Sequence, residues 1–296
     1  MKEIIDVAVG ADEQVVLMAD EIVYGQRKEW CDTGMRQLSL GLLKYRQFYS
    51  YDNHEKLPLI IWLCGGAFSE MKRNIWAPEM VYYAKHGYAV ALVEYTVNQR
   101  MRFPEPIVDV KEAVRFLRAN AEELNLNADR IAIMGESAGG MLATLVALTN
   151  GETEYEKGSN LEYSSAVQAV VPFYGIAGKV KHTGEHDNDT DPDTRSTASA
   201  SVFETMPDMM EMVKPGNPPF FVLFGTNDKL VSYQNGEIFY DIMQKAGNIC
   251  DLCLVNGAGH ADQQFYQPVV KDRVIRFIDQ YIKVGSKHKN KMEGKQ

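Results

Sequence analysis

The chain has 296 residues, of which 45% are hydrophobic and 24% are charged, a composition that is ordinary for a globular protein. The formal net charge is −9, and no basic stripe offsets it, which argues against nucleic acid as a main partner. Four cysteines in a chain of this length do not form a disulfide scaffold. We therefore expect one large domain over residues 1–284.

The first six residues mix acidic with apolar side chains and contain no signal-peptide core. The longest apolar run, residues 57–64, is far too short to span a bilayer. These two observations predict a cytoplasmic protein with no membrane partner. The sequence leaves the oligomeric state open, including a homo-oligomer.

Two or three antiparallel strands are expected within residues 12–56, with 15–18 and 38–43 as candidates. Residues 59–63 and 88–93 are continuous apolar runs, which is typical of strands buried on both faces. Between these runs, residues 78–86 predict a helix.

The rest of the chain alternates between apolar runs and helical patterns. A helix is expected from Pro104 to about Leu124, where apolar residues recur three and four positions apart. The later strands are expected at 130–134, 167–171, 220–224 and 250–255, and the later helices at 141–148, 238–246 and 268–282. This alternation predicts a mostly parallel, doubly wound α/β sheet.

Two segments break the alternation. Residues 176–218 have little apolar periodicity and separate two core strands, which predicts a small cap insertion. Residues 285–296 are rich in lysine and lack hydrophobic residues apart from Met292, which predicts a flexible basic tail.

The sequence G-E-S-A-G at residues 135–139 is the most informative motif. It lies between a predicted strand and a predicted helix, the context in which a G-x-S-x-G turn exposes a nucleophilic serine. A Cβ at either flanking position would collide across so tight a turn. Ser137 is therefore the predicted nucleophile.

A serine nucleophile needs a base within hydrogen-bond reach and an acid that orients the base. His260 lies just after the last predicted strand, and Asp228 follows the strand before it. Both therefore lie at the carboxyl edge of the sheet, beside Ser137. The chain order of nucleophile, acid and base agrees with that known for this kind of serine turn.

The tetrahedral intermediate of acyl transfer carries negative charge, which backbone N–H groups must meet. Ala138 supplies one donor at a helix N-terminus. The sequence C-G-G-A-F at 64–68 follows a predicted strand, and Gly66 and Ala67 are the expected further donors. Four aromatic residues near the carboxyl edges of strands are candidates for lining a small substrate pocket: Phe68, Trp76, Phe173 and Tyr174.

Two other patterns have metal-like composition. Cys250 and Cys253 lie in a predicted strand, where a spacing of three directs side chains to opposite faces. His182 and His186 lie in a segment whose glycines, asparagines and aspartates favour a solvated loop. We therefore expect no metal site, and the sequence gives no sign of a cofactor.

These motifs together resemble the esterase/lipase α/β-hydrolases related to hormone-sensitive lipase, and more narrowly the acetyl xylan and feruloyl esterases. The matching stretches are 62–68, 103–118, 129–140, 224–228 and 257–260. The resemblance implies an α/β-hydrolase fold, with Ser137, Asp228 and His260 as the catalytic triad.

The chain departs from that family at two places. The family usually has a histidine where this chain has Cys64, and that histidine braces the oxyanion loop. Cysteine is a weaker hydrogen-bond partner, so we expect the loop to be held differently. The family often has D-Y-R where this chain has E-Y-T at 94–96, so an arginine is absent there.

The resemblance implies a serine carboxylesterase that acts on small-molecule, short-chain acyl esters such as acetylated or feruloylated carbohydrates. Two alternatives remain at this stage. An amide hydrolase of arylformamidase or peptidase type would use the same triad. A non-catalytic binding protein on the same fold is disfavoured, because such proteins commonly lack a triad member.

Overall fold

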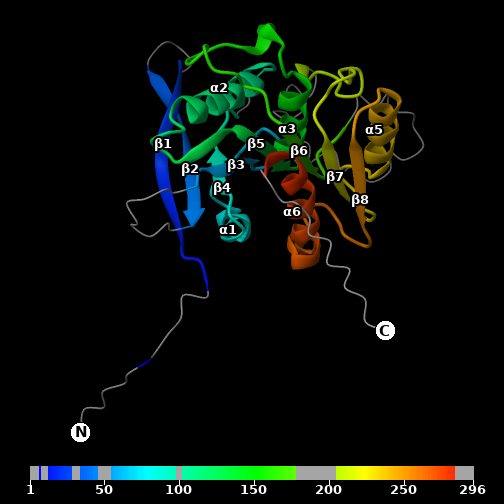
Figure 1. Ribbon diagram of the computed structural model, residues 1–296. Helices are drawn as coiled ribbons and strands as arrows, with labels where there is room; N and C mark the ends of the chain where they lie inside the picture. The colour runs from blue at the N-terminus through cyan, green and yellow to red at the C-terminus, as the bar shows by residue number, and fades with distance from the viewer. Residues whose placement is uncertain are drawn as a thin grey trace.

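The computed structural model describes residue 7 and residues 13–28, 34–45, 55–97, 102–177 and 205–283. Eight strands form one sheet in the order β1-β2-β4-β3-β5-β6-β7-β8 (Figure 1). Their bounds are β1 Val16–Lys28, β2 Met35–Tyr45, β3 Leu57–Leu63, β4 Ala89–Val93, β5 Leu126–Glu136, β6 Ala169–Phe173, β7 Phe220–Gly225 and β8 Cys250–Val255.

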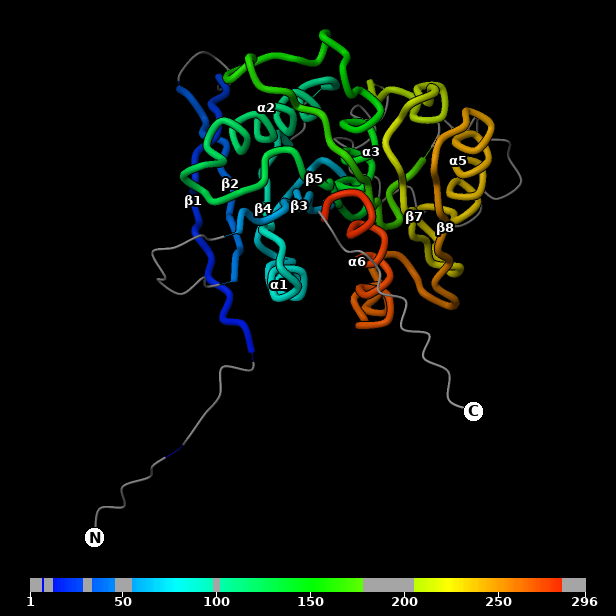
Figure 2. The backbone as a smooth tube through the Cα atoms, in the orientation of Figure 1, coloured from blue at the N-terminus to red at the C-terminus, as the bar shows by residue number. Residues whose placement is uncertain are grey.

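Strand β2 is antiparallel to both of its neighbours, β1 and β4. All pairs from β4 through β3 to β8 are parallel. Figure 2 shows blue β1 and β2 at one side of the sheet and β7 and β8 at the other. The predicted mostly parallel sheet with antiparallel N-terminal strands is therefore confirmed.

The central strands are buried on both faces, as their continuous apolar sequences predict. Every residue of β4, β6 and β7 is buried, and β3 has a single half-buried position. The edge strands differ: only Tyr24 is buried in β1, and only Cys250 in β8. The hydrophobic core is therefore concentrated around the central strands of the sheet.

Among the residues that the structure describes, five α-helices flank the sheet: α1 Ala77–Lys85, α2 Glu105–Ala119, α3 Ala138–Leu148, α5 Gln234–Lys245 and α6 Pro268–Ile282. Helices α1 and α6 lie together on one face, and α2 and α3 cover the other (Figure 1). Lys271 of α6 pairs with Glu79 of α1 at 2.8 Å, and Asp272 accepts a 2.5 Å hydrogen bond from Tyr82.

The register of the parallel strands brings their carboxyl ends to one edge. Leu63 pairs with Gly135, Glu136 with Phe173, and Gly225 with Val255. Residues that follow these strand ends therefore meet above the same edge of the sheet.

Several boundaries differ from the sequence predictions. Helix α2 ends at Ala119 rather than near Leu124, because Asn120 bonds back to the carbonyl of Phe116 and the chain turns there. Strand β5 begins four residues earlier and ends two residues later than predicted, and α3 begins directly after Ser137. Residues 178–204 of the predicted cap insertion, including His182 and His186, and the predicted tail lie outside the described residues.

None of the helices in the described ranges is both long enough and apolar enough to cross a membrane.

Candidate active site

The turn between β5 and α3 holds Ser137 in a strained backbone conformation. Its φ is 51° and its ψ is −122°, a region that residues with a side chain rarely adopt. A Cβ on Gly135 would lie 2.5 Å from the carbonyl oxygen of Gly139. A Cβ on Gly139 would lie 2.1 Å from the carbonyl oxygen of Leu63. The backbone itself therefore requires both glycines.

The three residues predicted to act together do lie together. The distance from Ser137 Oγ to His260 Nε2 is 2.9 Å, and from His260 Nδ1 to Asp228 Oδ2 it is 2.8 Å. Ser137 and His260 are both partly buried, whereas the Asp228 side chain is fully buried. This geometry allows a proton to move from the hydroxyl to an imidazole whose far nitrogen faces a carboxylate.

Backbone groups fix the carboxylate of Asp228. Its second oxygen, Oδ1, accepts N–H groups from Leu230 at 2.8 Å and Val231 at 2.9 Å. The ring of Tyr174 packs edge-on against the His260 ring, with their centroids 4.8 Å apart. The acid and the base are therefore each held from two sides.

The loop after β3 carries the predicted oxyanion donors. Gly66 has φ 128°, and a Cβ there would lie 1.8 Å from the carbonyl oxygen of Glu70. Ala67 and Phe68 both have positive φ, at 52° and 58°. Within the described part of the chain, no backbone carbonyl accepts from the N–H of Gly66 or Ala67. Ala138 is the first residue of α3, whose N–H has no partner inside the helix.

Glu136, next to Ser137, contacts this loop. Its Oε1 accepts the backbone N–H of Gly65, and the Cys64 Sγ lies 3.8 Å away. Burial is the main cause that raises the pKa of the Glu136 carboxyl above its usual value. Burial, followed by the nearby Glu136 charge, raises the pKa of the Cys64 thiol to about 12. The thiol is therefore protonated at neutral pH.

Other side chains hold the remainder of the loop. The hydroxyl of Tyr95 donates to the carbonyl of Cys64 at 2.6 Å. The indole Nε1 of Trp76 donates to Glu136 Oε1 at 3.2 Å, and its ring stacks on Tyr266 with centroids 4.3 Å apart.

Sequence reasoning assigned Glu136 no function. An acid in the second position of G-x-S-x-G carries no local signal for a contact 71 residues away. The signal available was Cys64, where the resembling family has a bracing histidine, together with an acid beside the nucleophile.

The four aromatic residues proposed for the substrate pocket differ from one another in burial. Phe68, Phe173 and Tyr174 are buried, and Phe68 contacts the rings of Tyr95 and Phe103. Trp76 is half-buried. Among the four, only Trp76 thus has substantial exposed surface in the described structure.

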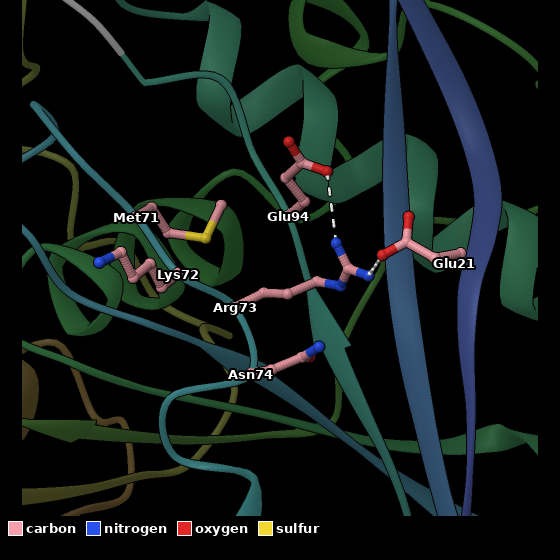
Figure 3. A pocket seen from close by; sticks show the side chains of 6 residues that line it. All are labelled: Glu21, Met71, Lys72, Arg73, Asn74 and Glu94. Atoms are coloured by element: carbon pink, nitrogen blue, oxygen red, sulfur yellow. Dashed lines mark hydrogen bonds and ion pairs between the residues drawn. The ribbon is translucent and has the colours of Figure 1, made fainter.

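A polar cavity of about 240 Å³ lies beside the second half of the oxyanion loop (Figure 3). Its lining residues are Glu21, Met71, Lys72, Arg73, Asn74 and Glu94. The Arg73 guanidinium lies 2.5 Å from a Glu21 oxygen and 3.8 Å from a Glu94 oxygen. These ion pairs tie the loop to β1 and to the residue after β4.

The position where the family has an arginine is Thr96, and arginines from elsewhere reach it. Arg36 of β2 donates to Thr96 Oγ1 at 3.0 Å and pairs with Glu94 at 3.5 Å. Arg27 of β1 pairs with Asp109 at 2.6 Å, and Asp109 in turn accepts the Thr96 N–H. The N-terminal strands thus supply cations around the E-Y-T segment.

No cluster of three metal-ligating side chains occurs among the residues that the structure describes.

The family model named BD-FAE matches residues 48–243, about two thirds of the chain. The chain belongs to the BD-FAE family. Its fold is that of the α/β-hydrolases, as its motifs implied.

Two sequence relatives come from Mycobacterium tuberculosis. "Probable carboxylic ester hydrolase LipM" is 32% identical over 197 residues, covering 64% of this chain and 45% of that protein. "Esterase LipQ" is 29% identical over 199 residues, covering 65% of this chain and 47% of that protein. The chain therefore spans about half the length of these relatives.

Solved structures show the same fold. A truncated carbohydrate esterase from gut microbiota superposes with a TM-score of 0.72 at 20% identity, covering 92% of this chain and 98% of that one. Esterase Est2 of Thermogutta terrifontis, with propionate bound, has a TM-score of 0.66 at 22% identity, covering 91% and 93%.

Proposed function

We propose that this protein is a serine carboxylesterase that hydrolyses short-chain acyl esters through a covalent acyl-enzyme. The observation that carries the proposal is the continuous chain of contacts from Ser137 Oγ through His260 to Asp228, with distances of 2.9 and 2.8 Å. Membership of a family whose relatives include esterases supports ester bonds as the target.

In the first step, His260 Nε2 takes the proton of Ser137 as Oγ bonds to the ester carbonyl carbon. The carbonyl π electrons move onto oxygen, and the N–H groups of Gly66, Ala67 and Ala138 are the proposed donors to that oxyanion. His260 then protonates the leaving alcohol as the C–O bond breaks. Asp228 holds the Nδ1–H tautomer and stabilises the imidazolium.

In the second step, His260 removes a proton from water, which attacks the acyl carbon. The tetrahedral intermediate collapses, the bond to Oγ breaks as His260 returns its proton to Oγ, and the acid is released. No redox partner is required, and the chain's own residues supply every proton transfer.

We further propose acetylated or feruloylated carbohydrates as the substrate class. The support is the family, together with a carbohydrate esterase among the structures of the same fold. Trp76 is the proposed residue for substrate contact, because it keeps exposed surface among the aromatic candidates.

The test is a comparison of initial rates on p-nitrophenyl acetate, butyrate and octanoate, methyl ferulate and acetylated xylo-oligosaccharides, with formylanilide as an amide. We expect turnover to fall from acetate to octanoate and to be slow on the anilide. Ser137→Ala should lower kcat by about 10⁴-fold or more. A variant that keeps a tenth of wild-type turnover would refute the nucleophile, and preference for the anilide would refute the ester assignment.

A further inference from the structure

The acyl-transfer steps described above do not use Glu136. It ends β5, is 5% exposed, and directly precedes Ser137. We propose that Glu136 is a positioning residue whose carboxylate fixes the oxyanion loop relative to the nucleophile. This inference rests on the proposed function and extends it, since it assigns to a second residue of the same turn the task of placing the oxyanion donors.

Three donors converge on one oxygen of this carboxylate. Oε1 accepts the backbone N–H of Gly65 and the indole N–H of Trp76 at 3.2 Å, and the protonated Cys64 thiol lies 3.8 Å away. Cys64 and Gly65 begin the loop and Trp76 ends it. One carboxyl group therefore closes the loop at both ends.

The loop is shaped to receive this carboxylate. A Cβ on Gly65 would lie 2.5 Å from Glu136 Oε1 and 2.8 Å from its other oxygen. No other residue type leaves that space free. The absence of a side chain at this position thus has a local cause, which is the carboxylate that occupies the space.

The contact lies one residue before the proposed donors. Gly65 is followed by Gly66 and Ala67, and a peptide unit is planar, so fixing the Gly65 N–H restricts the orientation of the next units. Glu136 shares its backbone with Ser137. The spacing between the attacking oxygen and the oxyanion donors is therefore set through a single residue.

Other contacts hold the loop from outside but do not reach the nucleophile turn. Tyr95 holds the Cys64 carbonyl, and Arg73 is paired with Asp20 and Glu21. These contacts fix the loop to β1 and to the segment after β4. Of the side chains named here, only Glu136 joins the loop to the turn that holds Ser137.

The experiment compares Glu136→Ala and Glu136→Gln with wild type. Active sites are counted by titration with a fluorophosphonate, so that kcat refers to folded enzyme. Kinetics on p-nitrophenyl acetate give kcat and KM, and a trifluoromethyl ketone, which forms a tetrahedral adduct with an oxyanion, gives Ki. The ratio of Ki to KM reports the oxyanion donors specifically.

We expect Glu136→Ala to lower kcat about 10²-fold, with KM changed by less than about threefold and Ki raised by about the same factor as kcat falls. Glu136→Gln keeps an acceptor oxygen at the same place and should recover at least about tenfold of that loss. A Glu136→Ala kcat and Ki within about threefold of wild type would overturn the proposal. So would a Glu136→Gln variant no better than Glu136→Ala.

Glu112→Gln is the matched control for loss of a buried carboxylate. Glu112 is 2% exposed and accepts from Arg27 and from the N–H of Ser159, away from the site. We expect a lower melting temperature and an unchanged kcat per active site. Equal kcat losses in Glu112→Gln and Glu136→Ala would mean general destabilisation and would overturn the proposal.

If Glu136→Ala does not fold, Trp76→Phe decides the matter through kcat and Ki at unchanged KM, because loss of the proposed substrate contact of Trp76 would raise KM instead. The substitution removes one donor to Glu136 while keeping a ring against Tyr266, and we expect kcat to fall about threefold to tenfold. Trp62→Phe is its control, because the Trp62 N–H has no hydrogen-bond partner among the described residues. Equal kcat in the two variants would overturn the proposal. Ser137→Ala, assayed in the same series, must be inactive; if it is active, the proposed function fails instead.

Discussion

The nucleophile side of the site and the oxyanion loop face each other above the same strand ends, but different forces hold them. On the nucleophile side, backbone atoms determine the geometry. Gly135 and Gly139 are confined by carbonyl oxygens, and Asp228 is fixed by two backbone N–H groups. The oxyanion loop is held by side chains, chiefly those of Glu136, Tyr95 and Arg73.

Because of this difference, we expect the nucleophile side and the oxyanion loop to respond differently to substitution. A backbone-held residue can change its chemistry while its position stays fixed. A loop held by side chains should shift when a distant side chain is lost. Three substitutions test the contrast, beginning with the largest expected effect.

Asp228→Asn should lower kcat about 10⁴-fold with little loss of stability. The Asn oxygen can keep the N–H groups of Leu230 and Val231, which leaves the amide NH₂ facing His260 Nδ1 and favours the wrong tautomer. Kinetics and thermal unfolding of the same preparation measure both quantities. A large drop in melting temperature with a small loss of kcat would contradict a backbone-held acid.

Gly139→Ala should lower kcat about 10²-fold or more, because its Cβ would meet the Leu63 carbonyl oxygen at 2.1 Å and displace Ser137. We expect a loss of about 1–3 kcal/mol in the free energy of unfolding. Gly140→Ala is the graded comparison, since its nearest contacts are 3.0 Å away. Equal effects of the two variants on kcat would show that the collision does not determine the turn.

Cys64→Ala tests the oxyanion loop, and of the three substitutions it should have the smallest effect. The Cys64 pKa is raised from 9.0 to about 12, so the unfolded thiol ionises first as pH increases. Wild-type stability should therefore be intact below pH 9 and decline toward pH 12, by at most about 1.4 kcal/mol per pH unit for this thiol.

Urea unfolding at a series of pH values across this range, for wild type and Cys64→Ala, measures that decline. The buried Cys250 thiol, whose pKa is also about 12, contributes equally to both proteins and cancels in the difference. If both proteins lose stability in parallel, Cys64 titrates at its ordinary value.

The positions on the nucleophile side could be predicted from the sequence, because each lies within five residues of the end of an apolar strand. Ser137, Asp228 and His260 all come after such runs, and parallel strands bring their carboxyl ends to one edge. The alternation of strands and helices also predicted the sheet. Local patterns were sufficient because the geometry there is local or is set by strand register.

The contacts of the oxyanion loop could not be predicted from local patterns. Glu136 and Gly65 are 71 positions apart, and Arg73 meets Glu21 over 52 positions. Charged side chains of this kind usually lie in solvent, so their pairing depends on the folded arrangement of β1, β3 and β5. The end of α2 was missed for a more local reason: Asn120 turns the chain while the apolar pattern continues toward Leu124.

The space above Gly65 has a consequence for how this sequence can vary. While Glu136 keeps its position, even a methyl group at position 65 meets its carboxylate, so that side chain must move to accommodate any substitution there. The shorter side chain of Glu136→Asp opens the room that Gly65→Ala needs. A library built for new specificity should therefore randomise positions 65 and 136 jointly, because their effects on fitness are not additive.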